Sequence, residues 1–286
     1  MTDGILLAIG AMLLMGVSDL IYKRAARAGI PTHQLLMVQS LLYTPPVIFY
    51  GWWTGTLQFP LASLWGAIAA VFAFTGFYNF AYSLKGGTVS SNATIFRLSF
   101  VLTALLGVVV LGEPLTALKV LGWALALTAA WLLLGDGGDQ QSAIDPALRR
   151  SSLIRVGVAT VSVGIANLLY KVGLNAGVTP AAMLVVQAAM VVSMSSLLVF
   201  RIDGRIRPLP ATYRFASMTS ILLAAAFILL MEGLARGQAS VLVPIAQMGF
   251  VLTAVLGFVF LREPVHARNV LGLVFAVGAL VSLAWS

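Results

Sequence analysis

Long apolar runs separated by short polar turns fill almost the whole chain. Most runs approach the roughly 20 residues that a helix needs to cross a bilayer core about 30 Å thick. Glycine, proline and charged residues mark the turns, as in Gly112-Glu113-Pro114. The pattern therefore predicts ten membrane-spanning helices, near residues 4–23, 33–53, 63–84, 88–111, 117–135, 153–172, 180–200, 213–235, 239–261 and 267–285.

The chain also contains an internal duplication. Residues 95–133 align without gaps with residues 245–283, and nineteen of the 39 aligned positions are identical. The first spans of the two halves match at an offset of 148, where Gly16 aligns with Gly164 and Tyr22 with Tyr170. Units of five spans, an odd number, must insert in opposite orientations. The prediction is an all-α integral membrane protein with ten transmembrane helices in two inverted five-helix repeats.

The repeat gives the expected division of the chain. Residues 1–135 form the first repeat, residues 136–152 a linker loop rich in glycine, aspartate and glutamine, and residues 153–286 the second repeat. No separate soluble domain and no cleavable signal peptide is expected.

Composition narrows the function classes. Of 286 residues 60% are hydrophobic and 9% charged, whereas a soluble domain has about a quarter charged residues. With no cysteine and only two loop histidines, His33 and His266, the sequence favours neither an enzyme nor a metal or cofactor site. A nucleotide-binding loop is absent, and the net charge of +8 fits basic loops better than nucleic-acid binding.

The basic residues predict an orientation. Loops after the odd-numbered spans carry 13 of the 17 lysines and arginines, whereas the opposite side has only Lys119, Lys171 and Arg236. Cytoplasmic loops are enriched in lysine and arginine, so the loops after the odd-numbered spans are expected in the cytoplasm. Both termini are then expected on the outer side of the cytoplasmic (inner) membrane.

Two related motifs end the fourth and ninth spans. They read LTALLGVVVLGEPLTALKVLG (Leu102–Gly122) and LTAVLGFVFLREPVHARNVLG (Leu252–Gly272). With ten spans in two halves, the chain resembles the EamA-like exporters of the drug/metabolite transporter (DMT) superfamily. The resemblance implies a central cavity lined mainly by spans 1, 3, 4, 6, 8 and 9, and export of small metabolites such as amino acids. Members are commonly drawn with cytoplasmic termini, the reverse of what the charge count predicts.

Arg97 is the sharpest candidate for substrate binding, because ionisable groups inside a membrane usually face a cavity or a partner. A guanidinium there can hold a carboxylate or phosphate through two parallel hydrogen bonds. Its repeat counterpart is the neutral Gln247, so the two equivalent sites are expected to be chemically unequal. Gln247, Tyr22 and Asn167 are further candidates for substrate binding. The alternative roles are an internal ion pair or a cap on the carbonyls of a broken helix.

Two intramembrane acids are candidates for proton coupling. Asp19 shares a helix face with Tyr22 and Lys23, and its counterpart Asn167 cannot titrate. An Asp19–Lys23 pair near the cytoplasmic boundary is the alternative. Glu232 aligns with Tyr82, and a pair between Glu232 and Lys171 is the alternative to a coupling role.

The remaining candidates are polar or helix-bending residues. Tyr78, Asn79 and Tyr82 form a polar aromatic face for substrate, although tyrosines near span ends also serve as interface anchors. Helix–helix hydrogen bonding is the expected role of Gln39 and Gln187. The expected hinges are the prolines inside spans, and the two Glu-Pro pairs are expected to end spans, each carboxylate capping the following helix. These residues are Pro45, Pro46 and Pro244, and Glu113-Pro114 and Glu263-Pro264.

The leading hypothesis is a secondary active exporter of a small anionic or zwitterionic, amino-acid-like metabolite, driven by proton exchange through alternating access. Its partners are then the metabolite, protons and the lipid bilayer, and the sequence leaves a homodimer open. A lipid-phosphate or other amphiphile translocase and a facilitative, channel-like carrier are the alternatives.

Overall fold

A computed structural model describes residues 2–83, 89–134, 146–260 and 266–286. Within these ranges the chain is helical apart from short turns and loops. The helices are α1 (Thr2–Arg27), α2 (Thr32–Trp53), η1 (Leu61–Ser63), α3 (Leu64–Ser83), α4 (Val89–Leu111), α5 (Ala117–Leu134), α6 (Pro146–Asn175), α7 (Pro180–Asp203), α8 (Pro210–Arg236), α9 (Ala239–Gln247), α10 (Gly249–Phe260) and α11 (Ala267–Ala284).

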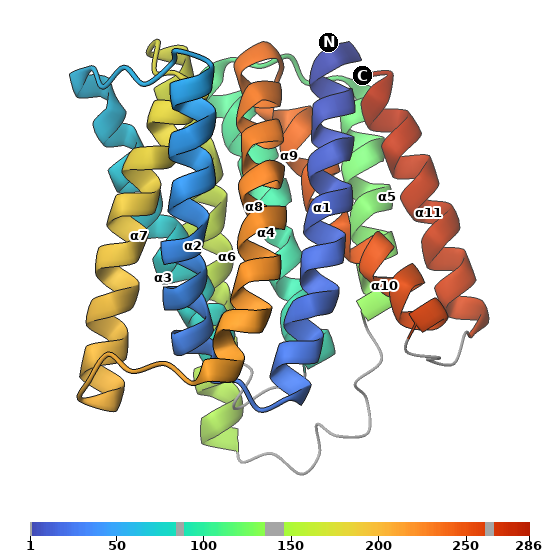
Figure 1. The fold of residues 1–286 in the computed structure, drawn as a ribbon. Helices are drawn as coiled ribbons and strands as arrows, with labels where there is room; N and C mark the ends of the chain where they lie inside the picture. Colours follow the sequence, from blue (N-terminus) through green and yellow to red (C-terminus); the bar gives the residue numbers. More distant parts are fainter. Residues whose placement is uncertain (1, 84–88, 135–145, 261–265) are drawn as a thin grey trace.

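The two halves of the chain run in opposite directions. In Figure 1, α1 descends from the N-terminus at the top of the bundle, whereas α6, its counterpart, ascends from the bottom. Both termini therefore lie at one end, which we call the terminal end. The other end, where α1 finishes and α6 begins, is here called the basic end (Figure 1). Most of the basic residues that the structure describes lie in or next to the helix ends there: Lys23, Arg24, Arg27, Arg149, Arg150, Arg155, Arg201, Arg205, Arg207, Arg214 and Arg268.

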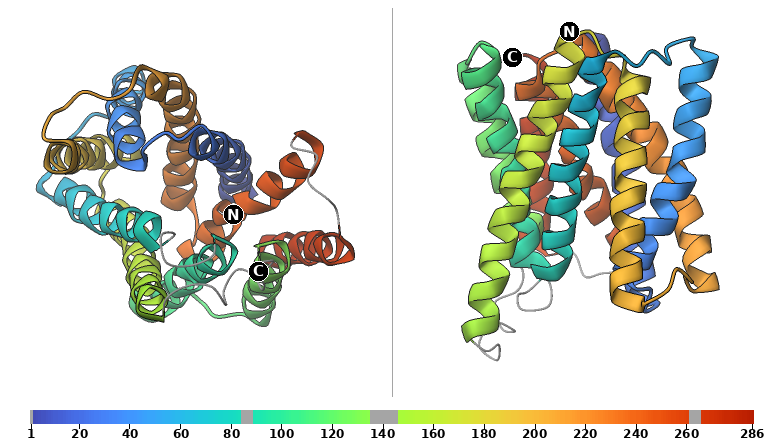
Figure 2. Two further views of the ribbon diagram at one scale, coloured as in Figure 1. Left: turned by 90° about the horizontal axis from the view of Figure 1, so that it is seen from below. Right: turned by 90° about the vertical axis from the view of Figure 1, so that its left-hand side faces the viewer.

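Packing between the halves follows the repeat. The extensive contact of α3 with α6 is mirrored by that of α8 with α1, and α5 packs on its own counterpart α11 (Figure 2). Glycines at equivalent positions of α5 and α11 let leucines of the partner helix pack closely. A Cβ at Gly122 would lie 2.6 Å from Leu283 Cγ, and a Cβ at Gly272 would lie 2.8 Å from Leu133 Cγ. Since each repeat packs largely against the other, the structure confirms the all-α, two-repeat fold.

The outer surface suits a bilayer. Nine stretches in the described part of the chain are long and apolar enough to cross a membrane, with α9 and α10 together forming one of them. The helix α2 is less apolar because it carries several polar side chains, but it spans the bundle alongside the others (Figure 1). Three of the four exposed tryptophans among the described residues lie at the terminal end, as expected at a membrane–water interface: Trp52, Trp53 and Trp285. The fourth, Trp131, lies near the other end of the bundle, in the last turn of α5.

Most helices begin and end within four residues of their expected bounds, and two elements differ by more than that or in continuity. The helix α6 begins at Pro146, seven residues before the expected span at 153, so that Arg149 and Arg150 lie on a helix. The span expected over 239–261 is broken into α9 and α10 at Met248. Its repeat counterpart α4 is continuous, so the two repeats differ at this point.

Candidate functional site

The break between α9 and α10 is capped by Arg97 from α4. Its Nη1 donates a hydrogen bond of 3.2 Å to the main-chain oxygen of Gln247, the last residue of α9. Its guanidinium carbon lies 5.2 Å from the ring centroid of Phe250 in α10. A cation suits this position, because the last carbonyls of a helix carry partial negative charge. The alternative expected from sequence, a cap on broken-helix carbonyls, is thus present.

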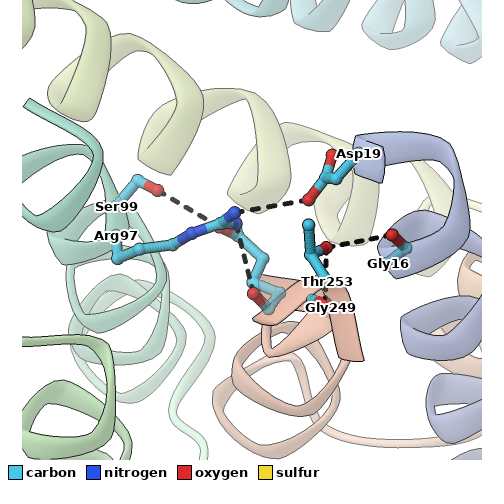
Figure 3. Close-up of polar contacts among 7 residues, drawn as sticks. Gly16, Asp19, Arg97, Ser99, Gly249 and Thr253 are labelled. Carbon is cyan, nitrogen blue, oxygen red and sulfur yellow. Dashed lines mark hydrogen bonds and ion pairs between the residues drawn. The ribbon is translucent and has the colours of Figure 1, made fainter. Parts of the chain in front are cut away.

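Asp19 of α1 completes an ion pair with the same arginine (Figure 3). Its Oδ2 lies 3.6 Å from Arg97 Nη2, and the two side chains keep 39% and 19% of their surface accessible. Among the described residues Arg97 Nε has no hydrogen-bond partner. The pair is therefore partly exposed, and its hydrogen-bonding capacity is not fully used.

Contact between Arg97 and Gln247 places this cluster at the symmetry element of the fold. The two residues occupy equivalent positions at an offset of 150, and they touch through Arg97 Nη1 and the Gln247 carbonyl. Ser99 Oγ adds a 3.4 Å hydrogen bond to Gln247 Oε1. Equivalent positions meet only near the pseudo-two-fold axis. The cluster also lies inside the bundle and not at its end. Arg97 is eight residues from the start of α4 at Val89, and at 1.5 Å per residue this is about 12 Å along the helix.

The same local packing recurs in the other repeat without the charges. Thr253 Oγ1 donates to the carbonyl of Gly16 at 2.9 Å, and Thr103 Oγ1 donates to that of Gly164 at 3.2 Å. Asn167, the counterpart of Asp19, is buried and donates to Thr103 Oγ1 at 3.4 Å. Only one of the two equivalent places therefore has an ion pair that is partly accessible.

Glu113 caps a helix in the other half of the chain. Its carboxylate accepts hydrogen bonds from the backbone N–H groups of Ala239 at 2.7 Å and Ser240 at 2.8 Å, at the start of α9. The expected cap on the following helix is corrected, because α5 lies after Glu113 and α9 belongs to the other repeat. Glu263 and Pro264 lie outside the described residues.

The fully buried Lys119 reinforces this end of α9. Its Nζ donates to the Pro114 carbonyl at 2.6 Å, to Ser240 Oγ at 3.0 Å and to Gln238 Oε1. These bonds attach the start of α9 to α5 and the turn before it. From the sequence, Lys119 was considered only as one of the few basic residues on the less basic side of the membrane, and its binding to the start of α9 was not predicted.

Pro244 has a compensating partner that the sequence did not reveal. A proline at 244 cannot donate to the carbonyl of residue 240, four positions earlier. That carbonyl instead accepts a 2.9 Å hydrogen bond from Trp123 Nε1 of α5. Pro45 and Pro46 lie inside the continuous helix α2. The hinge role of all three prolines stays a prediction.

Glu232 binds two groups at the terminal end. Tyr50 donates to its Oε1 at 2.5 Å, and Arg236 donates to its Oε2 at 2.7 Å, one helical turn away. Lys171, the partner considered from sequence, donates instead to the carbonyl of Leu234 at 2.6 Å. Glu232 therefore belongs to a cluster distinct from Asp19 and Arg97.

The polar face of α3 meets the first turns of α6. Arg155 Nη1 donates to Asn79 Oδ1 at 3.3 Å, and its guanidinium carbon lies 4.9 Å from the ring centroid of Tyr82. Tyr78 packs against Tyr82 with ring centroids 4.8 Å apart. These three candidates are thus grouped with Arg155, and no described contact joins them to Arg97.

The symmetry-related glutamines have unequal surroundings. Tyr22 donates to Gln39 Oε1, which also accepts a 3.4 Å bond from Thr219 Oγ1, so Gln39 links three helices. Gln187 Oε1 is buried and has no hydrogen-bond partner among the described residues. Tyr22 accordingly contacts α2 and α8, and no described hydrogen bond links it to Arg97.

Three residues at the cluster were missed by sequence reasoning: Ser99, Phe250 and Met248 at the helix break. Phe250 is identical to its repeat counterpart Phe100, so a comparison of the repeats did not single it out. Only the difference between Ser99 and its counterpart Gly249 could have drawn attention to this part of α4.

Comparisons with known proteins agree with this architecture. The model of the EamA-like transporter family matches residues 2–135 and again residues 151–285. One solved crystal structure superposes with a TM-score of 0.83 over 98% of this chain and 95% of its own, at 17% identity, and so supports the fold alone. No curated protein matches the chain. Because the family model matches both repeats and nearly the whole chain, this multi-pass membrane protein belongs to the EamA-like transporter family, whose members are membrane transporters of the DMT type.

Proposed function

We propose that this transporter exports a small zwitterionic, amino-acid-like metabolite across the cytoplasmic membrane in exchange for protons. The observation that carries the proposal is the accessible Asp19–Arg97 pair at the break between α9 and α10. Secondary transporters built from inverted repeats bind substrate near the repeat interface, beside interrupted helices.

The pair offers one group for each end of a zwitterion. Arg97 can hold the substrate carboxylate through two parallel N–H groups, and the Asp19 carboxylate can accept from the substrate ammonium. The first turn of α10 adds backbone N–H groups directed towards the helix break. A substrate would thus replace the 3.6 Å contact between the two side chains by its own charges.

Competition at Asp19 provides the coupling. A proton on Asp19 neutralises the carboxylate that the ammonium needs, so proton and substrate exclude each other from the same group. Protonation on the acidic side of the membrane releases the substrate, and deprotonation on the other side restores the site. Glu232 is the second candidate for this step, but it already accepts from Tyr50 and Arg236.

The test is uptake into proteoliposomes from a panel of amino acids, with and without an imposed pH gradient. Since a hydrogen bond to a charged group contributes about 1.5–3 kcal/mol, Asp19→Asn and Arg97→Gln should each weaken apparent substrate affinity by about tenfold to hundredfold. Asp19→Asn should also abolish acceleration by the gradient. Glu232→Gln is the matched control and should retain it.

Substrate analogues sharpen the result. An N-acetylated form of the transported amino acid keeps the carboxylate and loses the ammonium, so it should not compete with the substrate. The proposal fails if Arg97→Gln transports normally, or if Glu232→Gln rather than Asp19→Asn removes the pH dependence. Wild-type flux that ignores the pH gradient would indicate a facilitative carrier instead.

A further inference from the structure

An open groove lies at the basic end, between the first turns of α6 and the end of α3. It has a volume of about 570 Å³ and is lined by Asn79, Ala147, Arg150, Ser151, Ile154, Arg155 and Val158. Six of these residues occupy one face of α6, and Asn79 comes from the neighbouring helix α3. The groove is separate from the Asp19–Arg97 cluster and plays no part in the proposed exchange.

The polar part of the groove suits a phosphate group. Arg150 and Arg155 lie at its wall with Ser151 and Asn79, and none of the seven lining residues is acidic. Arg155 is held by its 3.3 Å bond to Asn79 Oδ1 and by the Tyr82 ring, 4.9 Å from its guanidinium carbon. A guanidinium fixed in this way can bind a phosphate with little further loss of side-chain freedom.

The apolar part continues the groove into the membrane. Ile154 lies one turn above Arg150 on α6, and Val158 lies one turn above Ile154, both exposed. Four residues of helix rise about 6 Å, so apolar surface extends roughly 12 Å from the arginine towards the bilayer interior. A charged head at the interface with an apolar tail alongside is the pattern of a phospholipid, not that of a free phosphate ion.

The other repeat lacks these features at the equivalent place. At the repeat offsets, Ser151 corresponds to Asp3 and Arg155 to Leu7, while Asn79 corresponds to Leu229 and Tyr82 to Glu232. The terminal end thus has apolar or acidic residues where the basic end has arginine and amide. The groove therefore distinguishes one leaflet of the membrane from the other.

We infer that this groove binds the phosphate headgroup of an anionic phospholipid, with an acyl chain along Ile154 and Val158. Basic pockets between transmembrane helices on the cytoplasmic side are suited to such headgroups. The adjacent rings of Tyr78 and Tyr82 fit the interfacial depth at which tyrosine is enriched.

Native mass spectrometry of the delipidated full-length protein tests the assignment. It is titrated with dioleoyl phosphatidylglycerol and, separately, with dioleoyl phosphatidylcholine. The anionic lipid should be retained preferentially. Arg150→Gln combined with Arg155→Gln should weaken its binding by about fivefold per arginine. The control pair Arg201→Gln and Arg214→Gln removes the same charge elsewhere at the basic end and should change binding less than twofold.

Two further arms separate the sources of phosphate and guard against misfolding. Glycerol phosphate has the headgroup without the chains and should not displace phosphatidylglycerol; equal competition would show a free-anion site and overturn the lipid assignment. Arg155→Lys keeps the charge but loses the planar contact with Tyr82, so it should give an intermediate loss. Equal retention of both lipids by the wild type, or equal losses in the groove and control pairs, would also overturn it.

Discussion

At the level of single residues, the positions that differ between the two repeats form the charged site. Arg97 and Gln247 were expected to occupy equivalent and chemically unequal sites, but they form one site in which the arginine binds the glutamine carbonyl. Asp19 and Asn167 remain apart, one in an ion pair with Arg97 and the other hydrogen-bonded to Thr103. The two repeats therefore place equivalent backbone positions side by side, and the ion pair at one of them comes from Asp19 and Arg97, which have no charged counterparts.

Gly16 is a sharp test of the close packing beside this centre. A Cβ at Gly16 would lie 2.6 Å from the Gly249 carbonyl oxygen and 2.8 Å from Leu252 Cβ. Backbone cannot move aside cheaply, so Gly16→Ala should destabilise the protein by about 1–3 kcal/mol. The measurement is thermal unfolding in detergent.

Gly157→Ala is the control for the same substitution within a helix. A Cβ at Gly157 would meet no atom within 4 Å, so the change should leave the melting temperature equal or slightly higher. Equal losses from the two variants would mean that the approach of α1 to α10 is not as close as the structure has it.

Sequence patterns predicted the ion-pairing partners poorly, for a physical reason. A pattern within one helix reveals neighbours three or four positions apart, which is why Lys23 was considered for Asp19. The partner observed, Arg97, comes from a different helix, and its position depends on how α1 and α4 are rotated about their axes. Hydropathy does not fix that rotation where both faces are largely apolar. Glu232 shows the complementary case, since Arg236 is a local partner one turn away.

At the level of elements, α9 is held by groups from the first repeat at its start, in its middle and at its end. Glu113 binds the N–H groups at its start, Trp123 supplies the hydrogen bond that Pro244 cannot make, and Arg97 caps its last carbonyl. A helix of nine residues is too short to be stable alone. Its position is therefore set by α4 and α5, so movement of α9 must be linked to movement of these helices.

The hydrogen bond from Trp123 gives a prediction for α9. Trp123→Phe leaves the Ser240 carbonyl buried without a donor, which should cost about 1–3 kcal/mol in addition to lost packing. With Pro244→Ala present, the new backbone N–H at 244 can bond to the same carbonyl. Trp123→Phe should then cost about 1 kcal/mol less, as measured by a double-mutant cycle of thermal unfolding. Additive effects would contradict the compensation.

The extent of most helices could be predicted from the sequence, because apolar runs mark the residues inside the membrane and turn residues mark the ends of the spans. The break at Met248 was not, because apolar residues continue through it and the proline lies four positions earlier. The interruption is supported by the contact of Arg97 with the freed Gln247 carbonyl and by the close approach of Gly16 to Gly249. Both are contacts between distant parts of the chain.

For the whole molecule, the inverted repeat explains why the strongest packing joins one half to the other. The helix α1 packs on α8, and α6 packs on α3, so neither five-helix unit covers its own inner surface. The two ends of the bundle differ in charge, because the described basic residues are concentrated at the basic end. That difference should decide the insertion of a fold whose backbone is nearly symmetric.

Orientation is therefore predicted with both termini outside and the basic end in the cytoplasm. The chain contains no cysteine, so one introduced thiol reports its own accessibility. A membrane-impermeant maleimide should label Ser286→Cys in intact cells and Arg205→Cys only after permeabilisation. The reverse labelling would place both termini in the cytoplasm and the arginine groove of α6 in the outer leaflet. It would also mean that loop arginines do not control insertion here, because the described basic residues of the basic end would then lie outside the cytoplasm.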